Sequence, residues 1–321
     1  MRPRRIEIVT GGRIHLGFYG LCSDNSRKLG GIGIGVDGVG YHIVVERSER
    51  GGVIVEGCQK ERAGIIAERA LGILGYNGGL KIVLKRCIPP HIGLGSTTQL
   101  TLSIFSSIGL LASKSIPYSV EASGRGPFSG IGVGVFLWGG FIVDSGVDRE
   151  KNRRARPVFY GAVPSSWRII ALVPKTTWRI EESEYERTLV ELPKGLSREQ
   201  CYRAMYLLLR RIIPGLADSD FNLFTEGVEE IQRLTGMYFS EAQRGLFCCP
   251  ESEEAAYLLK RVGAKGVGQS SWGPLVYGFF RDELEAYRAI REIRDFDGKV
   301  YVLSPRNKGA DIMVEVDEEP T

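Results

Sequence analysis

Residues Pro89 to Leu100, with the sequence PPHIGLGSTTQL, contain the residue types of an anion-binding loop. Glycine lets the backbone approach an anion closely, and the Ser-Thr-Thr run opens an apolar segment that we predict to be a helix. The N–H groups at a helix start and the positive end of its dipole favour phosphate. A glycine-rich turn followed by an ordinary Ser/Thr cap is the alternative. The candidate phosphate-binding residues are Gly93, Leu94, Gly95, Ser96, Thr97 and Thr98.

A second glycine-rich segment, GAKGVGQSSWGP, occupies residues 263–274. It is far from the first and is not an internal repeat, so the two segments together suggest one shared anion site. Lys265 and Arg125 are candidate charges for phosphate groups because glycine-rich segments carry both, although either could be a solvated surface side chain. The further candidate phosphate-binding residues are Gly266, Gly268, Gln269, Ser270 and Ser271.

Arg13 and His15 lie two positions apart in the segment GGRIHLGF. In a strand, this spacing places both side chains on the same side. Arg13 could then bind phosphate or carboxylate, and His15 could relay a proton, so both are candidate catalytic residues together with Lys265. The alternatives are an exposed arginine and a histidine at the edge of the core. His91 lies within the first loop, and we interpret it as a surface group.

These candidates require a scaffold that alternates strands and helices. Apolar spacing predicts a helix at Glu61–Leu74, and the strand Leu80–Lys85 that follows leads into the first loop. The glycine-rich segment 124–140 is unfavourable for a helix by propensity alone. An antiparallel sheet is predicted from short β-branched runs at residues 6–9, 33–36, 41–47 and 52–56.

A charged, proline-punctuated stretch at residues 145–166 precedes a new strand at 168–173 and predicts a domain boundary. We therefore expect two domains, residues 1–160 and 161–321. The β-α-β order beyond the boundary predicts a ferredoxin-like layer, and the fold class is α+β. The predicted C-terminal helices are 198–211, 218–235, 240–244, 253–262 and 282–292, and the strands are 275–280, 299–303 and 311–316.

Composition excludes several classes of protein. The chain has 321 residues, of which 43% are hydrophobic, and a net charge of +4 that is spread along it, so neither nucleic acid nor membrane binding is indicated. No apolar run reaches the roughly 18 residues of a membrane span, and no signal peptide precedes the first strand, which predicts a cytoplasmic protein.

Three histidines and six cysteines without Cys-x-x-Cys spacing predict structural thiols. Adjacent Cys248 and Cys249 could form a redox pair, but burial is favoured.

The three glycine-containing segments together resemble the ordered motifs of the GHMP kinase superfamily, whose middle motif is Pro-x-x-x-Gly-Leu-Gly-Ser-Ser. Six segments resemble more closely the beta-ribofuranosylaminobenzene 5'-phosphate synthase family, also called ribofuranosylphenol phosphate synthase. They are RIHLGF, GGIGIGVD, HIGLGSTTQL, GPFSGIGVGVF, WGGFIVDSG and GVGQSSWGPLVYG. The resemblance spans almost the whole chain and implies a two-domain GHMP kinase-like fold. Its N-terminal half would be like ribosomal protein S5 domain 2 and its C-terminal half ferredoxin-like, with Arg13 in the site.

The resemblance separates two reactions. Many kinases of the superfamily carry an aspartate directly after a Ser-Gly-Ile triplet, but here Ser129, Gly130 and Ile131 are followed by Gly132, which argues against a kinase. The closer family joins phosphoribosyl pyrophosphate to 4-aminobenzoate or 4-hydroxybenzoate, with release of pyrophosphate and CO2, in methanopterin synthesis. It implies these small molecules as substrates and suggests a homodimer.

Departure of pyrophosphate from a sugar requires compensation of the charge that develops on it. Cations, oriented N–H donors and a divalent metal such as Mg²⁺ would supply it. Asp144, Asp37 and Glu226 are possible metal ligands, with Asp144, at the end of a strand, the first choice. Trp272 could form a wall for the aromatic substrate, or it could serve packing.

Three classes of function follow from the sequence. A phosphoribosyltransferase that forms a C-riboside is favoured over an ATP-dependent small-molecule kinase. A non-catalytic binding protein is the third alternative, and the retention of both anion loops argues against it.

Overall fold

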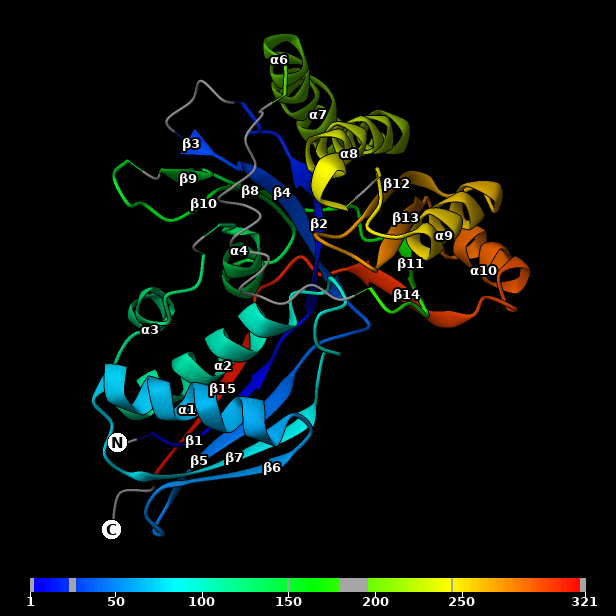
Figure 1. Cartoon of the computed structure of the whole chain (residues 1–321). Coiled ribbons are helices and arrows are strands. Elements are labelled where there is room, and N and C mark those ends of the chain that lie inside the picture. The colour runs from blue at the N-terminus through cyan, green and yellow to red at the C-terminus, as the bar shows by residue number, and fades with distance from the viewer. Residues whose placement is uncertain are drawn as a thin grey trace.

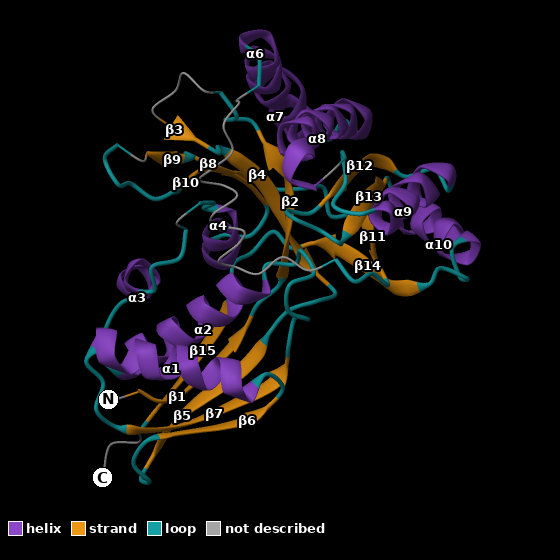
Figure 2. Cartoon of the chain, in the orientation of Figure 1, coloured by secondary structure: helices purple, strands orange, loops and turns teal. Residues whose placement is uncertain are grey.

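The computed structural model describes residues 3–22, 27–126, 128–148, 150–178, 196–243 and 245–317. Two large sheets carry most of the strands, and helices cover them (Figures 1 and 2). This mixture of separate sheets and helices confirms the predicted α+β class. Among the described residues, no helix is long and apolar enough to span a bilayer.

The first sheet has five strands in the order β15-β1-β5-β7-β6. The predicted antiparallel pairing holds for β1 and β5, but the predicted strand at 33–36 belongs to the second sheet, and the one at 52–56, β6, runs parallel to β7. The remaining pairs of this sheet are antiparallel. Helices α1 and α2 lie side by side against this sheet (Figure 1). The bounds are β1 Pro3–Val9, β5 His42–Ser48, β6 Val53–Gly57, α1 Lys60–Leu74, β7 Gly79–Arg86, α2 Ser96–Leu111 and β15 Asp311–Val316.

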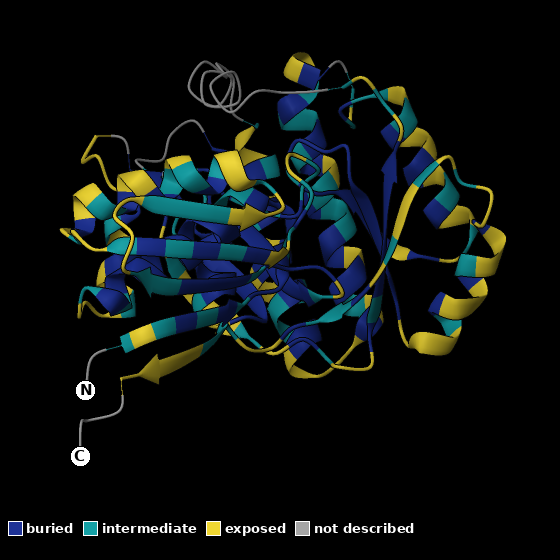
Figure 3. Ribbon diagram, turned by 90° about the horizontal axis from the view of Figure 1, so that it is seen from below, coloured by how far each residue is buried: buried dark blue, intermediate teal, exposed yellow. Residues whose placement is uncertain are grey.

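Helix α2 is buried along nearly its whole length. Figure 3 shows that buried residues gather in the interior of the molecule and exposed ones on the outer helices and loops. It packs against β1 and β5 of the sheet and against α1, α3 and α4. Its sequence LTLSIFSSIGLL has apolar or small side chains on every side, and a helix of this kind is stable only where it is buried. Because its neighbours hold α2 on several sides, its first turn, at Ser96, has a fixed position in the molecule.

The second sheet has eight strands. Seven of them lie side by side in the spatial order β10-β8-β4-β14-β11-β13-β12, and β2 pairs with β4. The C-terminal strands β14-β11-β13-β12 are antiparallel, and their chain order gives the ferredoxin-like arrangement predicted from the sequence. The bounds are β2 Gly12–Phe18, β4 Gly31–Asp37, β8 Phe141–Asp144, β10 Pro157–Gly161, β11 Arg168–Pro174, β12 Lys265–Gln269, β13 Val276–Phe280 and β14 Gly298–Pro305.

Helices pack against the C-terminal strands: α8 contacts β12 and β2, α9 contacts β11 to β13, and α10 contacts β11 and β13. Two separate helices predicted at 218–235 and 240–244 are in fact one continuous helix that ends at Gln243. The bounds are α6 Arg198–Leu207, the π-helix η1 Leu208–Ile212, α7 Ile213–Ala217, α8 Phe221–Gln243, α9 Pro250–Arg261 and α10 Glu283–Glu292. The short elements α3 Ile116–Ala122, α4 Ile131–Leu137, β3 Arg27–Lys28 and β9 Val147–Asp148 complete the described chain.

The two halves of the chain are joined through their sheets. Strand β14 pairs with β4 through Ser304 and Pro305, and β15 then returns to pair with β1. Between them, buried Arg306 donates hydrogen bonds to the carboxylates of Asp37 and Asp311. Strand β15 lies beyond the predicted boundary but completes the first sheet. The boundary between residues 160 and 161 stays a prediction.

Four of the six cysteines form disulfides, so their interpretation as structural thiols is wrong. Cys22 pairs with Cys201, and Cys58 pairs with Cys87. These partners are 179 and 29 residues apart, and only the folded chain brings them together. Cys248 and Cys249 are free, with their Sγ atoms 3.6 Å apart, and burial raises the pKa of the Cys248 thiol.

Candidate active site

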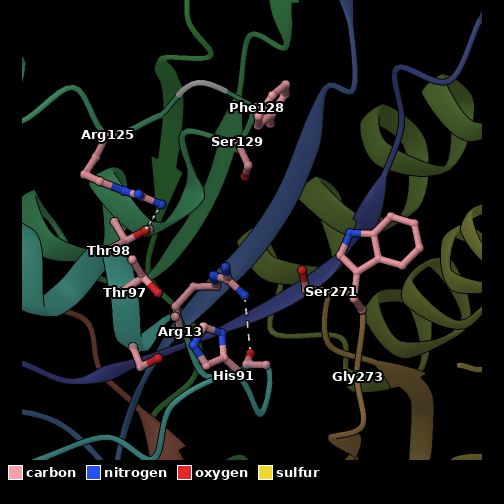
Figure 4. Close-up of a pocket in the computed structure, with 14 residues that line it drawn as sticks. Arg13, His91, Thr97, Thr98, Arg125, Phe128, Ser129, Ser271 and Gly273 are labelled. Carbon is pink, nitrogen blue, oxygen red and sulfur yellow. Dashed lines mark hydrogen bonds between the residues drawn. The ribbon is translucent and has the colours of Figure 1, made fainter. Parts of the chain in front are cut away.

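A cavity of about 170 Å³ lies at the N-terminal end of α2, where segments far apart in the sequence meet (Figure 4). One wall is the first glycine-rich loop, and the others come from β2, from the segment before α4 and from the loop after β12. Its lining residues are Arg13, His91, Gly93, Gly95, Ser96, Thr97, Thr98, Arg125, Phe128, Ser129, Gly132, Ser271, Trp272 and Gly273.

The first glycine-rich loop has the geometry of an anion cradle. Gly93 and Gly95 have φ values of +96° and +75°, a left-handed conformation that glycine adopts without steric cost. No side chain caps α2, and its first helical hydrogen bond runs from Gln99 N–H to the Gly95 carbonyl, 3.1 Å away. The N–H groups of the preceding three residues, with the positive end of a 16-residue helix, therefore form a favourable environment for negative charge.

Two arginines bring positive charge to this cavity. Arg13 donates to the Gly93 carbonyl at 3.3 Å, and Arg125 donates to the Thr98 hydroxyl at 3.2 Å. Figure 4 shows the two side chains entering the cavity from different walls. Guanidinium groups and helix N–H donors together recognise phosphate oxygens. The cavity is therefore suited to a phosphate or diphosphate group.

The two glycine-rich segments meet, as the sequence predicted. The hydroxyl of Ser270 donates to the Gly93 carbonyl at 2.6 Å, and Ser271 lines the cavity. Gln269 is buried and structural, since its Oε1 accepts from the Cys248 N–H at 2.7 Å.

The rest of the second segment lies elsewhere. Residues 265–269 form strand β12 and not a loop, so Gly266 and Gly268 do not line the cavity. The side chain of Lys265 is exposed, also outside the cavity. Leu94 is buried in the hydrophobic core and anchors the first glycine-rich loop there.

His15 lies beneath the cavity and not in its lining. It is buried, and its Nδ1 accepts a hydrogen bond from the Gly17 N–H at 3.2 Å. The ring proton of the neutral form is therefore on Nε2, which faces the Ser129 hydroxyl at 3.5 Å. Burial, with a smaller contribution from Arg13, lowers the pKa of His15 well below its usual value. His15 is consequently neutral at physiological pH.

Asp144 is the centre of a buried hydrogen-bond cluster. Its carboxylate accepts from the N–H groups of Gly31, Gly130 and Gly146 at 2.8–3.0 Å and from the Ser129 hydroxyl at 3.1 Å. Desolvation by burial raises the pKa of Asp144 to about 6, although these hydrogen bonds oppose the shift. The cluster fixes Ser129, and with it the segment that enters α4, at the edge of the cavity.

The described lining of the cavity contains hydroxyls and guanidinium groups but no carboxylate. In the described part of the chain, no group of three or more His, Cys, Asp or Glu side chains could hold a metal ion. Asp144 is already fully hydrogen-bonded, Asp37 pairs with Arg306, and Glu226 pairs with Arg211. These residues do not fit a resident Mg²⁺ site.

Several lining residues were not predicted from the sequence. Phe128 and Ser129 were missed because they lie within a glycine-rich stretch whose path depends on the Asp144 cluster. His91 is exposed, as predicted, and also borders the cavity, with a φ of 57°. Trp272 both lines the cavity and packs against Phe239, with ring centroids 4.9 Å apart.

Gly132 occupies the position where many kinases carry a carboxylate. A Cβ on this residue would stand 2.9 Å from Thr98 Cγ2, so a side chain there would collide with the first turn of α2. The close packing of α4 against α2 thus requires glycine at this position.

The fold and the site define a class of protein. A family model for the C-terminal region of GHMP kinases matches residues 212–298. The structure of homoserine kinase from Cytophaga hutchinsonii is similar, with a TM-score of 0.69 and 19% identity, covering 96% of this chain and 97% of that one. Mevalonate pyrophosphate decarboxylase from Streptococcus pyogenes has a TM-score of 0.68 and 12% identity, covering 96% and 98%. The chain therefore has the two-domain GHMP kinase fold predicted from its motifs.

The sequence relatives narrow this class to one family. Beta-ribofuranosylphenol 5'-phosphate synthase from Methanothermobacter thermautotrophicus is 30% identical over 95% of this chain and 98% of the relative. The protein of the same name from Archaeoglobus fulgidus is 28% identical over 96% of this chain and 100% of the relative. The chain belongs to the beta-ribofuranosylphenol 5'-phosphate synthase family.

Proposed function

We propose that the protein transfers a phosphoribosyl group from phosphoribosyl pyrophosphate to 4-hydroxybenzoate or 4-aminobenzoate, with release of pyrophosphate and CO2. The product is a C-riboside for methanopterin synthesis. The observation that carries this proposal is the cavity in which Arg13, Arg125 and the start of α2 converge, in a chain that belongs to this synthase family.

The anion cradle is suited to the first half of the reaction. As the anomeric C–O bond breaks, negative charge accumulates on the departing pyrophosphate. The N–H groups of Ser96 to Thr98 and the guanidinium of Arg13 are in place to stabilise this charge without rearrangement. Arg125, anchored on Thr98, would hold a second phosphate oxygen.

The second half of the reaction requires a positioned aromatic ring. The ring carbon that bears the carboxylate attacks the anomeric carbon, and the C–C bond to the carboxylate then breaks to restore aromaticity. Electron donation from the para hydroxyl or amino group assists the attack. Phe128 and Trp272 provide apolar surface beside the cradle, where they could orient the ring and exclude water.

We propose that Mg²⁺ enters as a complex with the pyrophosphate of the substrate. Mg²⁺ commonly keeps several waters and binds through substrate phosphates. The hydroxyls that line the cavity are compatible with such a complex. This route fits a cavity whose described lining offers no carboxylate.

A GHMP-type kinase is the second candidate, because solved structures with this fold include a homoserine kinase. The contact between Gly132 and Thr98 argues against it, since it leaves no room for the carboxylate that many of these kinases use. A kinase would require ATP, whereas the proposed synthase would not.

The test is the release of labelled CO2 from carboxyl-labelled 4-hydroxybenzoate and 4-aminobenzoate. The purified protein is incubated with Mg²⁺ and phosphoribosyl pyrophosphate, without ATP. Release that depends on both substrates supports the synthase, and the faster acid identifies the acceptor. If folded protein releases no label from either acid, the proposal is wrong, and ATP turnover with small alcohols is measured instead.

We also propose a cytoplasmic, homodimeric protein. Its disulfides are compatible with this location if the source is a hyperthermophile, whose intracellular proteins often contain them. Cell fractionation would test the location, and light scattering of the purified protein would test the dimer.

A further inference from the structure

A second hollow, of about 380 Å³, lies where β3, the end of α3 and residues from 145 to 156 meet. Four arginines line it, namely Arg27, Arg153, Arg154 and Arg156, with Glu121 as the only carboxylate among its described lining residues. It shares no described lining residue with the cavity at the N-terminal end of α2, which we call the anion cavity. Four arginines and one glutamate give its described walls a formal net charge of +3.

Few of the guanidinium donors in this hollow are committed to the protein. Arg27 donates to the Ser145 hydroxyl at 3.1 Å and to the Gly146 carbonyl at 3.2 Å. Arg156 donates to Glu121 Oε1 at 3.4 Å, and Arg154 donates to the Glu121 carbonyl at 3.3 Å. Within the described chain, the Arg153 side chain makes no hydrogen bond or ion pair. Because each guanidinium carries five N–H donors, most of this capacity is available to a ligand.

The arginines are gathered by backbone contacts that hold their segment in place. Asp148 and Arg153 exchange backbone hydrogen bonds of 2.7 and 2.9 Å, and the Ser145 N–H donates to the Arg156 carbonyl at 2.8 Å. Between them, Ala155 is buried and its N–H donates to the Gly126 carbonyl at 3.0 Å. The chain thus presents like charges together in spite of their mutual repulsion.

A fifth guanidinium adds to this concentration of charge. The point where a Cβ on Gly124 would stand is 3.1 Å from Arg69 Nη2 and 3.7 Å from Arg154 Nη2. Two side chains from different elements, α1 and the segment after β9, therefore converge over one glycine. Their repulsion would be relieved by a bound anion.

We propose that this hollow binds a small phosphate-class oxyanion, such as inorganic phosphate or pyrophosphate, at a site separate from the anion cavity. Guanidinium forks match the oxygens of a phosphate, and a cluster of them compensates a multiply charged ion. With a volume of about 380 Å³, the hollow has room for an ion of this size. The proposal concerns binding alone and does not depend on the reaction proposed above.

Isothermal titration calorimetry with inorganic pyrophosphate, and separately with inorganic phosphate, tests this site without using turnover. The probes are titrated into the wild-type protein, into Arg13→Gln, and into the triple variant Arg153→Gln, Arg154→Gln, Arg156→Gln. We expect the triple variant to lose one binding event, or to bind it at least about tenfold more weakly, while Arg13→Gln retains that event. Comparison of the two probes identifies which ion the site prefers.

A matched control removes the same number of charges elsewhere. Arg288, Arg291 and Arg294 are exposed on or just after α10, and their replacement by glutamine should leave the binding event unchanged. The proposal is wrong if neither ion binds at millimolar concentration, if the first triple variant, folded by circular dichroism, binds like wild type, or if the control weakens binding equally. Loss of the event in Arg13→Gln alone would assign it to the anion cavity and also overturn the proposal.

Discussion

The anion cavity and the Asp144 cluster lie next to each other, but their polar groups are used in opposite ways. In the cavity, the N–H groups of the first turn of α2 have no partner within the helix. Arg13 and Arg125 line the same cavity. In the cluster, both carboxylate oxygens of Asp144 are fully engaged by four donors. The ligand site is therefore marked by helix N–H groups that have no partner within the helix, whereas the satisfied cluster holds the fold.

The largest effect should come from removing the acceptor at the centre of the cluster. Asp144→Ala leaves three buried backbone N–H donors and the part-buried Ser129 hydroxyl without this acceptor, and we expect the free energy of unfolding to fall by about 4 kcal/mol. Chemical denaturation followed by tryptophan fluorescence measures this loss. Ser145→Ala, at the next position, is the control and should cost much less. A loss below about 1 kcal/mol for Asp144→Ala would show that the cluster is not a structural centre.

The sequence predicted the chemistry of the cavity better than that of the cluster. A Gly-x-Gly-Ser run before an apolar segment determines its own local structure, because glycine permits the turn and the helix must begin after it. The role of Asp144 depends on Gly31, Gly130 and Gly146, which only the folded chain brings to one point. No local pattern around Asp144 distinguishes a metal ligand from a hydrogen-bond acceptor.

The same limit explains the other differences between expectation and structure. The segment at 263–274 has more glycines than the first loop, four against two, but residues 265–269 pair with β13 and become a strand. Tertiary contacts determine that this segment pairs with β13, and its glycine content does not indicate this pairing. The ferredoxin-like order was accessible from sequence because helices and strands alternate there in a regular way.

The pH dependence of stability should separate the cluster from the cavity further. The pKa of Asp144 is about 6 in the folded protein and near 3.8 for an ordinary aspartate, so the unfolded chain loses this proton first as pH rises. Ionisation between these values therefore favours unfolding. The contribution of Asp144 to stability falls by about 3 kcal/mol in total as pH rises from below 3.8 to above 6, with about 2 kcal/mol of this fall between pH 4 and 6 and little change above about pH 7. The difference in unfolding free energy between wild type and Asp144→Asn, measured at pH 4, 5, 6 and 7.5, should show this slope. A difference independent of pH would contradict it.

In the cavity, Arg13→Gln should reduce activity and leave stability nearly unchanged. The loss of a charged donor to phosphate should lower kcat/KM for phosphoribosyl pyrophosphate by about 10- to 100-fold. Arg13→Lys keeps the charge but not the fork, so an intermediate value is expected. Steady-state kinetics and thermal unfolding are measured together. A large fall in stability with normal kinetics would place Arg13 with the structural residues instead.

Two glycine substitutions compare the glycine-rich segments directly. Gly95→Ala puts a side chain at a φ of +75° and 3.2 Å from Arg13 Cβ, so we expect a severalfold rise in KM for phosphoribosyl pyrophosphate. Gly268→Ala places a Cβ 2.4 Å from Gln232 Cγ, which should lower the free energy of unfolding by about 1–3 kcal/mol without changing KM. The same kinetic and denaturation measurements apply to both variants. Equal effects on KM would show that both segments contact the substrate.

The smallest effect is expected at Lys265, although its charge and its glycine-rich surroundings resemble those of a phosphate ligand. Its side chain is exposed on β12 and outside the described lining of the cavity. Lys265→Ala should therefore change kcat/KM by less than about threefold, as is usual for a surface substitution. Measured beside Arg13→Gln, this variant tests whether position in the cavity, and not charge alone, determines function. A loss comparable to that of Arg13→Gln would mean that β12 also reaches the substrate, so that the cavity described here is only part of the site.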